Sequence, residues 1–540
     1  MVVSLEWPRR HSGISTGFVH SVNNDSVILS LDTSLTASSS WAPPTEQESG
    51  RDNRLWRLDK DELCTGSGWL RANVARLLTD DQHMRRLRSL LVDLDAPRYG
   101  PATLAVNDSD QSLLGKLNAE QARAIDHVLA ARDYALILGM PGTGKTTTIA
   151  RLVQVLARGQ KSVLLASFTN AAVDNVLLKL KAHGQDFLRV GSVDSVHQGI
   201  VEYTVDGCID GHTPASIAEL YNSAMVVATT CMGAKHDLFR KRRFDYCIVD
   251  EASQISQSMC LGPLCCADVF VLVGDHYQLS PLVRSVEAQH KGMSISLFKR
   301  LSESHSQAVH RMCSQYRMNE SIMNLSNELV YGGQLRCGTP EIASSVLQLP
   351  SWPSTDNHSA WIKDVLAPTS PVVFIDTDTV SAAEDRSGDA LHNVAEASIV
   401  AELVGRLIEL GISSQLADIV GIISPYRSQL QVIRAALQRQ LQGHASLQAD
   451  RVEVNTIDRY QGRDKDCIIL SLVRSNRSQA VGDLLKDWRR INVAITRAKT
   501  KMIFVGSAST LRGSAVFDLL ITSLARQGQI QSMPADWVVK

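Results

Sequence analysis

The sequence predicts an α/β fold in which two parallel β-sheets, each covered by helices, follow a smaller β-rich module. Short β-branched runs such as "SVLLASFT" and "YCIVDE" alternate with amphipathic stretches such as "AAVDNVLLKL", which is the pattern of strands joined by crossover helices. The same alternation returns in "PVVFIDT", "IVGIISP" and "DCIILSLV". A chain of 540 residues is long enough for two or three domains.

The composition is that of a folded protein rather than a disordered or membrane-spanning one. Hydrophobic residues make up 44% of the chain and charged residues 21%. No apolar run approaches the roughly 18 residues that a membrane span requires, and the start lacks the apolar core of a secretory signal. We therefore expect a soluble intracellular protein. The net charge of -1 gives no overall attraction to nucleic acid, so any such binding must come from a local groove.

The ten cysteines are predicted to be reduced core residues. No C-x-x-C pair occurs, and several cysteines lie within apolar strand-like runs such as "DYCIVD". Cys260, Cys265 and Cys266 form the tightest group, but their spacing is poor for a metal or iron–sulfur site and no fourth ligand is nearby. A metal cage is therefore not expected.

Residues 1–105 form the predicted β-rich module and a helical arm. The stretch "GFVHSVNNDSVILSLD" alternates around Asn23, Asn24 and Asp25 like a β-hairpin, and a Ser/Pro-rich stretch follows. The arginine-rich segment "RANVARLLTDDQHMRRLRSLLVDL" has helical spacing. Its basic side chains fit either a solvated helix face or an arm that faces nucleic acid.

Residues 106–310 form the first predicted sheet domain, which contains a phosphate-binding loop. In "LILGMPGTGKTTTIARL" a buried strand leads into a helix that starts near Thr146. Between them "GMPGTGKT" fits G-x-x-x-x-G-K-[ST], in which backbone N–H groups turn onto phosphate oxygens, Lys145 reaches the terminal phosphates and Thr146 offers a magnesium ligand. The predicted nucleotide-binding residues of the loop are Gly139, Gly142, Thr143, Gly144, Lys145, Thr146 and Thr147.

Two carboxylates in "CIVDEAS" follow another apolar strand, at the edge where ligands bind in open α/β sheets. Asp250 would hold magnesium directly or through water, and Glu251 would orient and deprotonate the attacking water. A third strand, "VFVLVGDHYQL", also ends in polar residues and places Gln278 at the position of a γ-phosphate sensor. With the loop, these residues predict a nucleoside triphosphatase.

Residues 311–540 form the second predicted sheet domain, and the segments 192–222 and 338–370, which lack clear periodicity, are expected to be insertions or loops. Arg317 in "SQYRMN" and Arg497 in "RRINVAITRAK" are candidate arginine fingers. Such an arginine is worth ~10³ to 10⁵ in rate, roughly 4 to 7 kcal/mol of barrier. Hydrolysis would then wait for the two domains to close, as a translocating motor requires. The predicted catalytic residues are Lys145, Asp250, Glu251, Gln278, Arg317 and Arg497.

Taken in order, the motifs resemble those of superfamily 1 helicases, in the group that includes the nonsense-mediated-decay RNA helicase. The series is "LNAEQARAI", "GMPGTGKT", "SFTNAAVDN", "VATTCMGA", "VDEASQ", "GDHYQLSPLV", "SQYRMN", "VNTIDRYQGRDKDCIILSLVRSN" and "RRINVAITRAK". The stretches "YNSAMVVATTCMG" and "GDLLKDWRRINVAITRAK" are most similar to the helicase portion of the eukaryotic replication helicase/nucleases, which trim Okazaki-fragment flaps and resect DNA ends. The resemblance implies two RecA-like motor domains of the P-loop NTPase type and a barrel-like N-terminal module.

The resemblance also implies a biochemical role. It implies ATP and Mg²⁺ as cofactors, 5′ to 3′ movement on single-stranded DNA or a 5′ flap, and no membrane partner. The implied setting is the nucleus, with the mitochondrion as an additional compartment and with single-strand-binding protein and replication or repair nucleases as partners. By the same carry-over, Gln121 reads the adenine and Asp464 touches the ribose. The residues that would line the strand-binding groove are Thr169, Asn170, Thr230, Thr456 and Arg474.

Two departures from the family pattern stand out. "HYQLSP" carries Tyr277 and Ser280 where the family usually has other residues, although Gln278 is retained. Full-length family members begin with a RecB-like nuclease domain and a [4Fe–4S] cluster, whereas this sequence has no E-x-K tripeptide and no matching cysteine group. We expect ATPase activity without nuclease activity, and the chain is interpreted as the helicase portion of a longer gene product.

Several alternatives remain open at this stage. An RNA helicase of the same architecture is the nearest rival, because phosphate and stacking contacts tolerate either sugar. An ATP-gated clamp that holds single strands for a nuclease without travelling is compatible with every motif. The N-terminal module would either contact the duplex or partner proteins, or cap the first motor domain.

Overall fold

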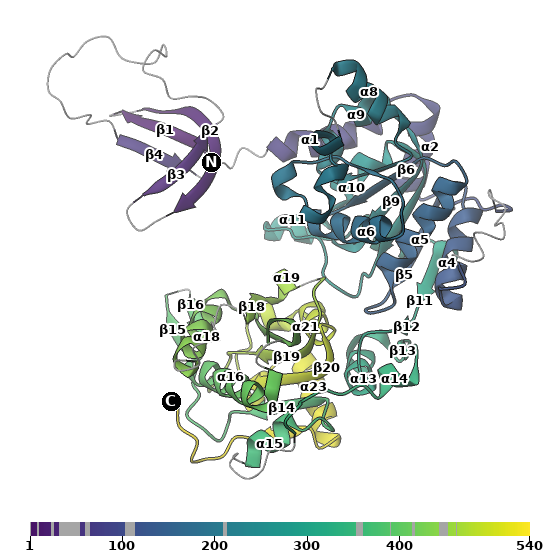
Figure 1. The fold of residues 1–540 in the computed structure, drawn as a ribbon. Helices are drawn as coiled ribbons and strands as arrows, with labels where there is room; N and C mark the ends of the chain where they lie inside the picture. Colours follow the sequence, from purple (N-terminus) through teal and green to yellow (C-terminus); the bar gives the residue numbers. More distant parts are fainter. Residues whose placement is uncertain are drawn as a thin grey trace, which may run out of the picture. The chain divides into compact units, whose positions relative to one another are not determined.

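The computed structural model describes residues 2–7, 10–22, 26–31, 55–59, 65–102, 114–208, 213–352, 360–388, 390–412, 416–441, 452–460 and 462–539. The chain comprises two compact units, Met1–Ala75 and Arg76–Lys540. Figure 1 draws four strands of the smaller unit as one sheet and the larger unit as two α/β lobes, each with a sheet flanked by helices.

The smaller unit contains a four-stranded antiparallel sheet in the order β3-β2-β1-β4. Strands β2 and β3 pair from Gly17 with Leu31 to Val22 with Val27, which is the expected hairpin. Its turn residues, 23–25, lie outside the described residues. The predicted β-rich character of the N-terminus is thus confirmed. The strands are β1 (Val2–Trp7), β2 (Arg10–Val22), β3 (Val27–Leu31) and β4 (Leu55–Asp59).

The arginine-rich arm forms two helices, α1 (Thr65–Arg76) and α2 (Gln82–Leu91). The apolar side chains of α2 are buried, and the Asp81 side chain accepts a hydrogen bond from the Met84 N–H at its start. Arg86 and Arg98 both pair with the buried Asp133 carboxylate, at 2.7 and 2.8 Å. Arg86 therefore anchors α2 to the first sheet domain, a role that helical spacing alone did not indicate.

The first large sheet has seven parallel strands in the order β11-β5-β10-β9-β6-β8-β7. Its central strands are buried because helices cover the sheet, as the near-continuous apolar runs predicted. The helices α4 (Ala119–Ala130), α5 (Lys145–Arg158) and α6 (Asn170–Ala182) pack in sequence against one another. The strands are β5 (Tyr134–Gly139), β6 (Val163–Ser167), β7 (Leu188–Arg189), β8 (Val226–Thr230), β9 (Phe244–Asp250), β10 (Ala267–Gly274) and β11 (Val309–Met312).

The second large sheet has six parallel strands in the order β18-β17-β19-β20-β14-β21. One core cluster unites the sheet with α16 (Val394–Leu407) and α18 (Arg427–Gln440), which also pack together. The predicted pair of RecA-like parallel sheets is thus confirmed. The strands are β14 (Val372–Asp376), β17 (Val420–Ser424), β18 (Glu453–Thr456), β19 (Lys465–Ser471), β20 (Ala498–Gly506) and β21 (Ile530–Ser532).

The segments expected to be loops contain short helices. Helix α8 (Pro214–Ser223) lies within 192–222 and begins with a capping box between Thr213 and Ser216. Helices α14 (Pro340–Ala343) and α15 (Ala360–Leu366) lie within 338–370. Helices of one to three turns are too short to give a recognisable period, so the loop expectation was wrong for these residues.

Short helices and small sheets make up the remaining structure of the larger unit. The other helices are α7 (Val205–Cys208), α9 (Leu238–Lys241), α10 (Gln257–Leu264), α11 (Val286–His290), α12 (Leu297–Ser304), α13 (Glu320–Ser326), α17 (Leu416–Ile419), α19 (Ile457–Tyr460), α20 (Asp483–Lys486), α21 (Trp488–Ile495), α22 (Ala508–Leu511) and α23 (Ala515–Arg526). The 3₁₀ segments are η1 (Val193–Ser195), η2 (Gln198–Tyr203), η3 (Gly233–Lys235), η4 (Ala252–Gln254) and η5 (Ser306–Ala308), and the π-helical segments are η6 (Asn327–Tyr331) and η7 (Ile408–Ile412). The small sheets pair β12 (Ser314–Gln315) with β13 (Arg336–Cys337) and β15 (Asp385–Ser387) with β16 (Ala390–His392).

The chain passes between the two large sheets directly after β11. This strand pairs with β5, so the first sheet uses residues on both sides of the boundary predicted at 310. Strand β12 follows within two residues and belongs to a separate small sheet. The division into 1–105, 106–310 and 311–540 stays a proposal.

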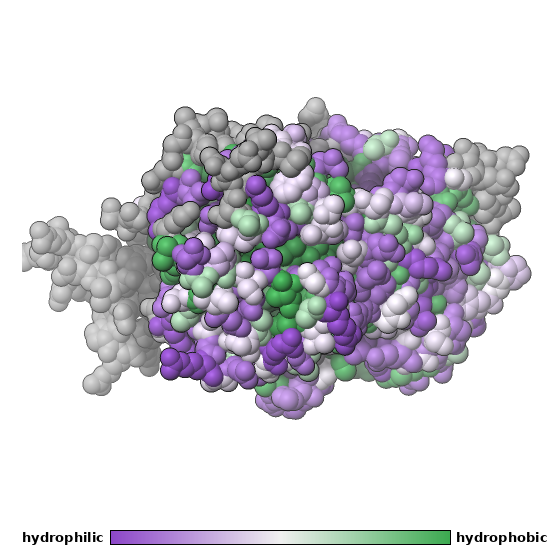
Figure 2. Space-filling view, turned by 90° about the horizontal axis from the view of Figure 1, so that it is seen from below, coloured by the Kyte–Doolittle hydropathy of each residue, from purple (hydrophilic) through white to green (hydrophobic). Residues whose placement is uncertain are grey.

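The burial of the cysteines and the mixed polarity of the surface are those of a folded protein, as the composition predicted. All nine cysteines in the described residues are free thiols, and six of them are buried. Figure 2 shows hydrophilic residues interspersed with hydrophobic ones on the face it draws. Within the described ranges, no helix combines the length and the apolar character that a membrane crossing needs.

Candidate functional site

A cavity of about 1070 Å³ in the larger unit is lined by residues of both sheet domains. The first domain contributes the phosphate-binding loop and the carboxyl ends of β6 and β9. The second contributes the segments around Arg317, Asp464 and Arg497. Predicted site residues that line this cavity are Gly142, Thr143, Gly144, Lys145, Thr146, Thr147, Thr169, Asp250, Glu251, Gln278, Arg317, Asp464 and Arg497.

The loop between β5 and α5 joins a buried strand to a helix, as the sequence predicted. Gly144 caps α5 with a left-handed φ of 83°, and the Lys145 Nζ donates to the Gly139 carbonyl at 2.8 Å. The lysine side chain lies so close that a Cβ at Gly139 would come within 2.3 Å of its Cγ. The Thr143 hydroxyl donates to the Met140 carbonyl at 2.8 Å, which tightens the turn. The loop therefore needs its glycines for close packing as well as for backbone freedom.

The loop is tied to the segment that carries Arg317. The Tyr316 N–H donates to the Gly142 carbonyl at 2.8 Å, and a Cβ at Gly142 would come within 2.8 Å of the Arg317 Cβ. Because Gly142 has a φ of 74°, a larger residue would be both strained and crowded. A shift of the second domain at Tyr316 and Arg317 would therefore also displace the phosphate-binding loop.

Gln121 reaches the loop from the start of α4. Its Nε2 donates to the Thr143 carbonyl at 3.0 Å, and its Oε1 accepts from the Asn118 N–H in a capping box. The neighbouring Glu120 accepts from the Cys313 and Ser314 N–H groups at 2.7 and 2.8 Å. Helix α4 therefore connects the loop to the start of the second domain. The sequence did not single out Glu120, because an acidic residue in a first helical turn is common.

Asp250 and Glu251 lie at the carboxyl end of β9, beside the lysine. Burial, and secondly the adjacent Glu251 charge, raise the pKa of the Asp250 carboxyl above its ordinary value, while Lys145 opposes the shift. Glu251 adopts a left-handed φ of 52°, which is uncommon for a residue with a side chain. Its Oε2 accepts from the Gln254 Nε2 at 2.9 Å. Two carboxylates and a lysine thus share one partly enclosed site.

Gln278 is held by a polar chain that enters the second domain. Its Nε2 donates to the buried Asp275 carboxylate at 2.8 Å, and the Tyr331 hydroxyl donates to the same oxygen at 2.8 Å. The Asn492 Nδ2 donates in turn to the Tyr331 hydroxyl, at 2.9 Å, and to the Tyr277 carbonyl, at 3.1 Å. Asp275 and Asn492 lie within quoted motifs, but nothing in the sequence distinguished Tyr331.

Arg317 and Arg497 meet at one carboxylate. The Asp464 Oδ2 lies 2.9 Å from the Arg317 Nε, and its Oδ1 lies 3.5 Å from an Arg497 Nη. Arg497 is only 3% exposed, and its Nε donates to the Val493 carbonyl at 3.1 Å. Burial, and secondly the Arg317 charge, lower the pKa of Arg497 to about 10. Asp464 is therefore engaged with both arginines, a contact that the resemblance did not indicate.

The predicted groove residues are distributed over strand ends in both domains. Thr169 caps α6 by accepting from the Ala172 N–H, and it lines the cavity. The Asn170 Oδ1 accepts from the buried Arg189 at 2.7 Å, and the Thr230 hydroxyl oxygen accepts from the Gly233 N–H at 3.0 Å. Thr456 ends β18.

Arg474, the fifth predicted groove residue, follows β19 and is only 14% exposed. Its Nε donates to the Glu384 Oε2 at 2.9 Å. The Glu384 carboxylate also accepts from the Ser475 N–H at 2.8 Å and from the Asn476 Nδ2 at 3.0 Å. The arginine is therefore held in a fixed position rather than free in solvent.

Among the described residues, no three His, Cys, Asp or Glu side chains are grouped so that they could hold an ion. One or two carboxylates beside a phosphate loop agree with a cation that receives most of its ligands from a phosphate and water.

Comparison with known proteins gives matches along most of the chain. One family described as an AAA domain matches residues 116–217 and 209–286, and another with the same description matches residues 293–509. A DNA replication ATP-dependent helicase/nuclease of Xenopus laevis is 44% identical over 550 residues, which cover 99% of this chain and 50% of that protein. One of Arabidopsis thaliana is 43% identical over 97% of this chain and 38% of that protein. The structure of an arterivirus helicase with DNA covers 74% of this chain and 65% of that one, with 15% identity and a TM-score of 0.36.

Proposed function

Because the chain belongs to the family of the DNA replication ATP-dependent helicase/nucleases, of which it spans about half the length or less, we propose that it is an ATP-driven helicase on single-stranded DNA. The observation that supports this most is the shared cavity, in which the phosphate loop and two carboxylates of one domain lie with two arginines of the other. Such a site is complete only when residues of both domains are present, so the rate of nucleotide hydrolysis would depend on the relative position of the domains.

The first domain would hold ATP and Mg²⁺. The loop N–H groups and Lys145 would bind the phosphates, and Gln121 would contact the base from the start of α4. Thr146 and Asp250 would hold the ion, which supplies neutralisation of the phosphate charge. The residues fit this ion, because a cation beside Asp250 would offset both its burial and the adjacent Glu251 charge, which together raise the pKa of its carboxyl.

The hydrolytic step would use residues from both domains. Glu251 would accept the proton of the attacking water, and Gln278 would sense the terminal phosphate. Arg317 and Arg497 would neutralise the charge that develops on the transferred phosphoryl group. The polar chain from Gln278 to Tyr331 and Asn492 supports a coupling of this step to the position of the second domain.

The nucleic-acid substrate is proposed from the relatives, whose names state DNA replication. We propose single-stranded DNA or a 5′ flap, 5′ to 3′ movement and a nuclear setting with replication and repair partners. Thr169, Asn170, Thr230, Thr456 and Arg474 remain the proposed groove residues. Their positions at or near strand ends and helix starts are suitable for phosphate contacts.

A comparison of DNA and RNA as activators tests the substrate. ATP hydrolysis by the purified chain is measured with oligonucleotides of identical sequence in either sugar. We expect stronger stimulation by DNA, and stronger stimulation by RNA would support an RNA helicase instead.

A strand-displacement assay tests movement. Partial duplexes with a 5′ or a 3′ overhang are incubated with the chain and ATP. We expect displacement from the 5′ overhang only. Binding and ATP hydrolysis without displacement from either substrate would support the non-translocating clamp.

A further inference from the structure

The residue directly before Arg474 has a strained backbone. Val473 has a φ of 71°, and the Arg474 N–H donates to the Leu472 carbonyl at 2.8 Å, which closes a γ-turn around it. This turn is rare, and a left-handed φ is a genuine outlier for a β-branched residue. The turn follows β19 directly, at the carboxyl edge of the second sheet. Because strain of this kind persists only when its surroundings enforce it, the neighbours of Val473 are informative.

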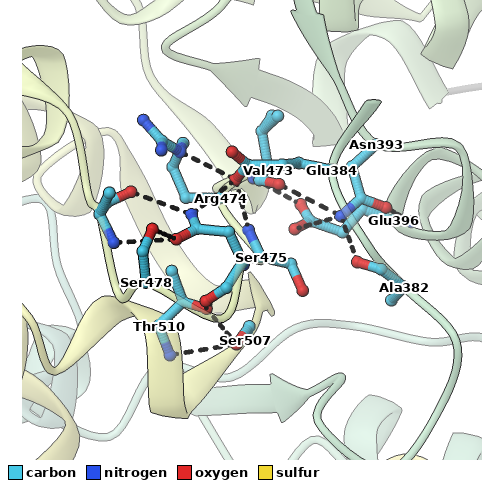
Figure 3. A network of polar contacts seen from close by, with 12 residues as sticks. Ala382, Glu384, Asn393, Glu396, Val473, Arg474, Ser475, Ser478, Ser507 and Thr510 are labelled. Atoms are coloured by element: carbon cyan, nitrogen blue, oxygen red, sulfur yellow. Dashed lines mark hydrogen bonds and ion pairs between the residues drawn. The ribbon is translucent and has the colours of Figure 1, made fainter. Parts of the chain in front are cut away.

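Two side chains at the start of α16 hold the turn (Figure 3). The Glu396 Oε2 accepts from the Val473 N–H at 2.8 Å and from the Ser471 hydroxyl at 2.7 Å. The Asn393 Nδ2 donates to the Val473 carbonyl at 3.2 Å and to the Ala382 carbonyl at 2.8 Å. Both polar groups of the strained residue are thus bound from one helix end, and Glu396 and Asn393 are fully buried.

The turn sets the direction of the chain that follows it. Beyond Val473, the Arg474 side chain and the Ser475 N–H converge on the Glu384 carboxylate, and the Glu384 N–H donates to the Ser475 carbonyl at 3.1 Å. Figure 3 shows these groups gathered beside the Glu396 pair. A backbone rotation at Val473 would move Arg474 away from Glu384. The position of the arginine therefore depends on the turn.

We propose that Glu396 is a positioning residue of the strand-binding groove, which holds Val473 in its strained γ-turn and thereby fixes Arg474 at the carboxyl edge of the second sheet. This inference rests on the proposed function, because it assumes that Arg474 contributes to binding a nucleic-acid phosphate. Glu396 itself touches no substrate, since it is fully buried.

The chemistry of Glu396 agrees with a holding role. Burial raises the pKa of the Glu396 carboxyl to about 8, whereas the hydrogen bonds from the Val473 N–H and the Ser471 hydroxyl act to lower it. No cation pairs with it among the described residues, so its bonds to the turn are the interactions that offset its burial. A glutamine is therefore a conservative replacement, because its carbonyl oxygen accepts the same two bonds without a charge.

The test uses Val473→Gly, which removes the backbone strain of the turn. Glu396→Ala is expected to weaken binding of a labelled oligothymidine by about tenfold, because the strained turn is no longer held. Glu396→Gln is expected to bind within about threefold of the unmodified chain. In the Glu396→Ala background, Val473→Gly is expected to restore binding, whereas Val473→Ala is not, because only glycine adopts the left-handed φ at no cost. Both replacements remove buried methyl groups, so the difference between them isolates the backbone.

Matched controls separate this inference from the proposed function. Glu402→Gln alters another buried glutamate of α16, whose carboxylate accepts from the Trp537 Nε1, and it should leave binding unchanged. Equal oligothymidine affinity of the glycine and alanine double variants would overturn the positioning role. If Glu396→Ala does not fold, Val473→Gly and Val473→Ala are compared in the otherwise unmodified chain, and a lower affinity of the glycine variant than of the alanine variant would also overturn the positioning role. Failure of the unmodified chain to bind oligothymidine would instead refute the proposed function.

Discussion

Replacement of Asp464 by asparagine decides between two roles for this carboxylate. The resemblance implies a contact with the ribose, in which case Asp464→Asn should weaken nucleotide binding. The structure shows Asp464 between Arg317 and Arg497, in which case the substitution should leave two guanidinium groups without a neutralising partner. We expect the second outcome: tighter binding of a triphosphate and a less stable protein.

The magnitude follows from the geometry. Two unit charges about 4 Å apart interact with about 4 kcal/mol at an effective dielectric constant of about 20. Asp464 is 25% exposed, so solvent screens part of its attraction to the buried Arg497. We therefore expect a loss of about 1 to 3 kcal/mol in the free energy of unfolding. The uncompensated charge should tighten binding of the triphosphate by up to about tenfold, or about 1.4 kcal/mol.

The assay pairs titration of a fluorescent ATP analogue with urea denaturation of the same samples. Asp466→Asn is the matched control, because Asp466 lines the same cavity but pairs with the half-exposed Lys499 at 3.6 Å. Affinity that falls tenfold or more while the free energy of unfolding is unchanged would refute the arginine-holding role and support the ribose contact.

Three further substitutions test other parts of the site and its support. Arg497→Ala should lower kcat of strand-stimulated ATP hydrolysis by ~10³ with a smaller change in KM, and a loss below about tenfold in steady-state kinetics would contradict its catalytic role. Gly144→Ala should abolish detectable nucleotide binding in calorimetry, because its Cβ would lie 2.5 Å from the Gln121 Nε2 at a φ of 83°, whereas Gly528→Ala, equally left-handed but uncrowded, should bind normally. Asp133→Asn should lower the free energy of unfolding by about 1 to 2 kcal/mol at neutral pH, because it removes the buried carboxylate with which the partly exposed Arg86 pairs. Burial acts to raise the pKa of Asp133, but hydrogen bonds from Arg86 and Arg98 lower it below its ordinary value of 3.8. The difference in the free energy of unfolding between the unmodified chain and the variant should therefore shrink as pH falls below 3.8. An unchanged difference in urea denaturation at acid pH would contradict this.

Local sequence patterns were sufficient to predict much of the fold and the residues of the proposed nucleotide site. The apolar runs of β5, β9 and β19 identify buried parallel strands by themselves, because a strand covered on both faces has no polar alternation. The loop from Gly139 to Thr146 identifies phosphate binding, because its spacing meets a backbone requirement within eight residues. Each of these patterns lies within one short segment of the chain, so a single sequence is sufficient to recognise it.

Only the tertiary structure decided which distant residues share one site. The meeting of Arg317 and Arg497 at Asp464, and the hold of Glu396 on Val473, join residues far apart in the chain, and no local pattern records such pairs. The strain at Val473 was equally hidden, because valine normally favours an extended backbone and only buried polar partners enforce another one. The sequence by itself thus determined which groups are available, and the packing of two sheets determined which of them face each other.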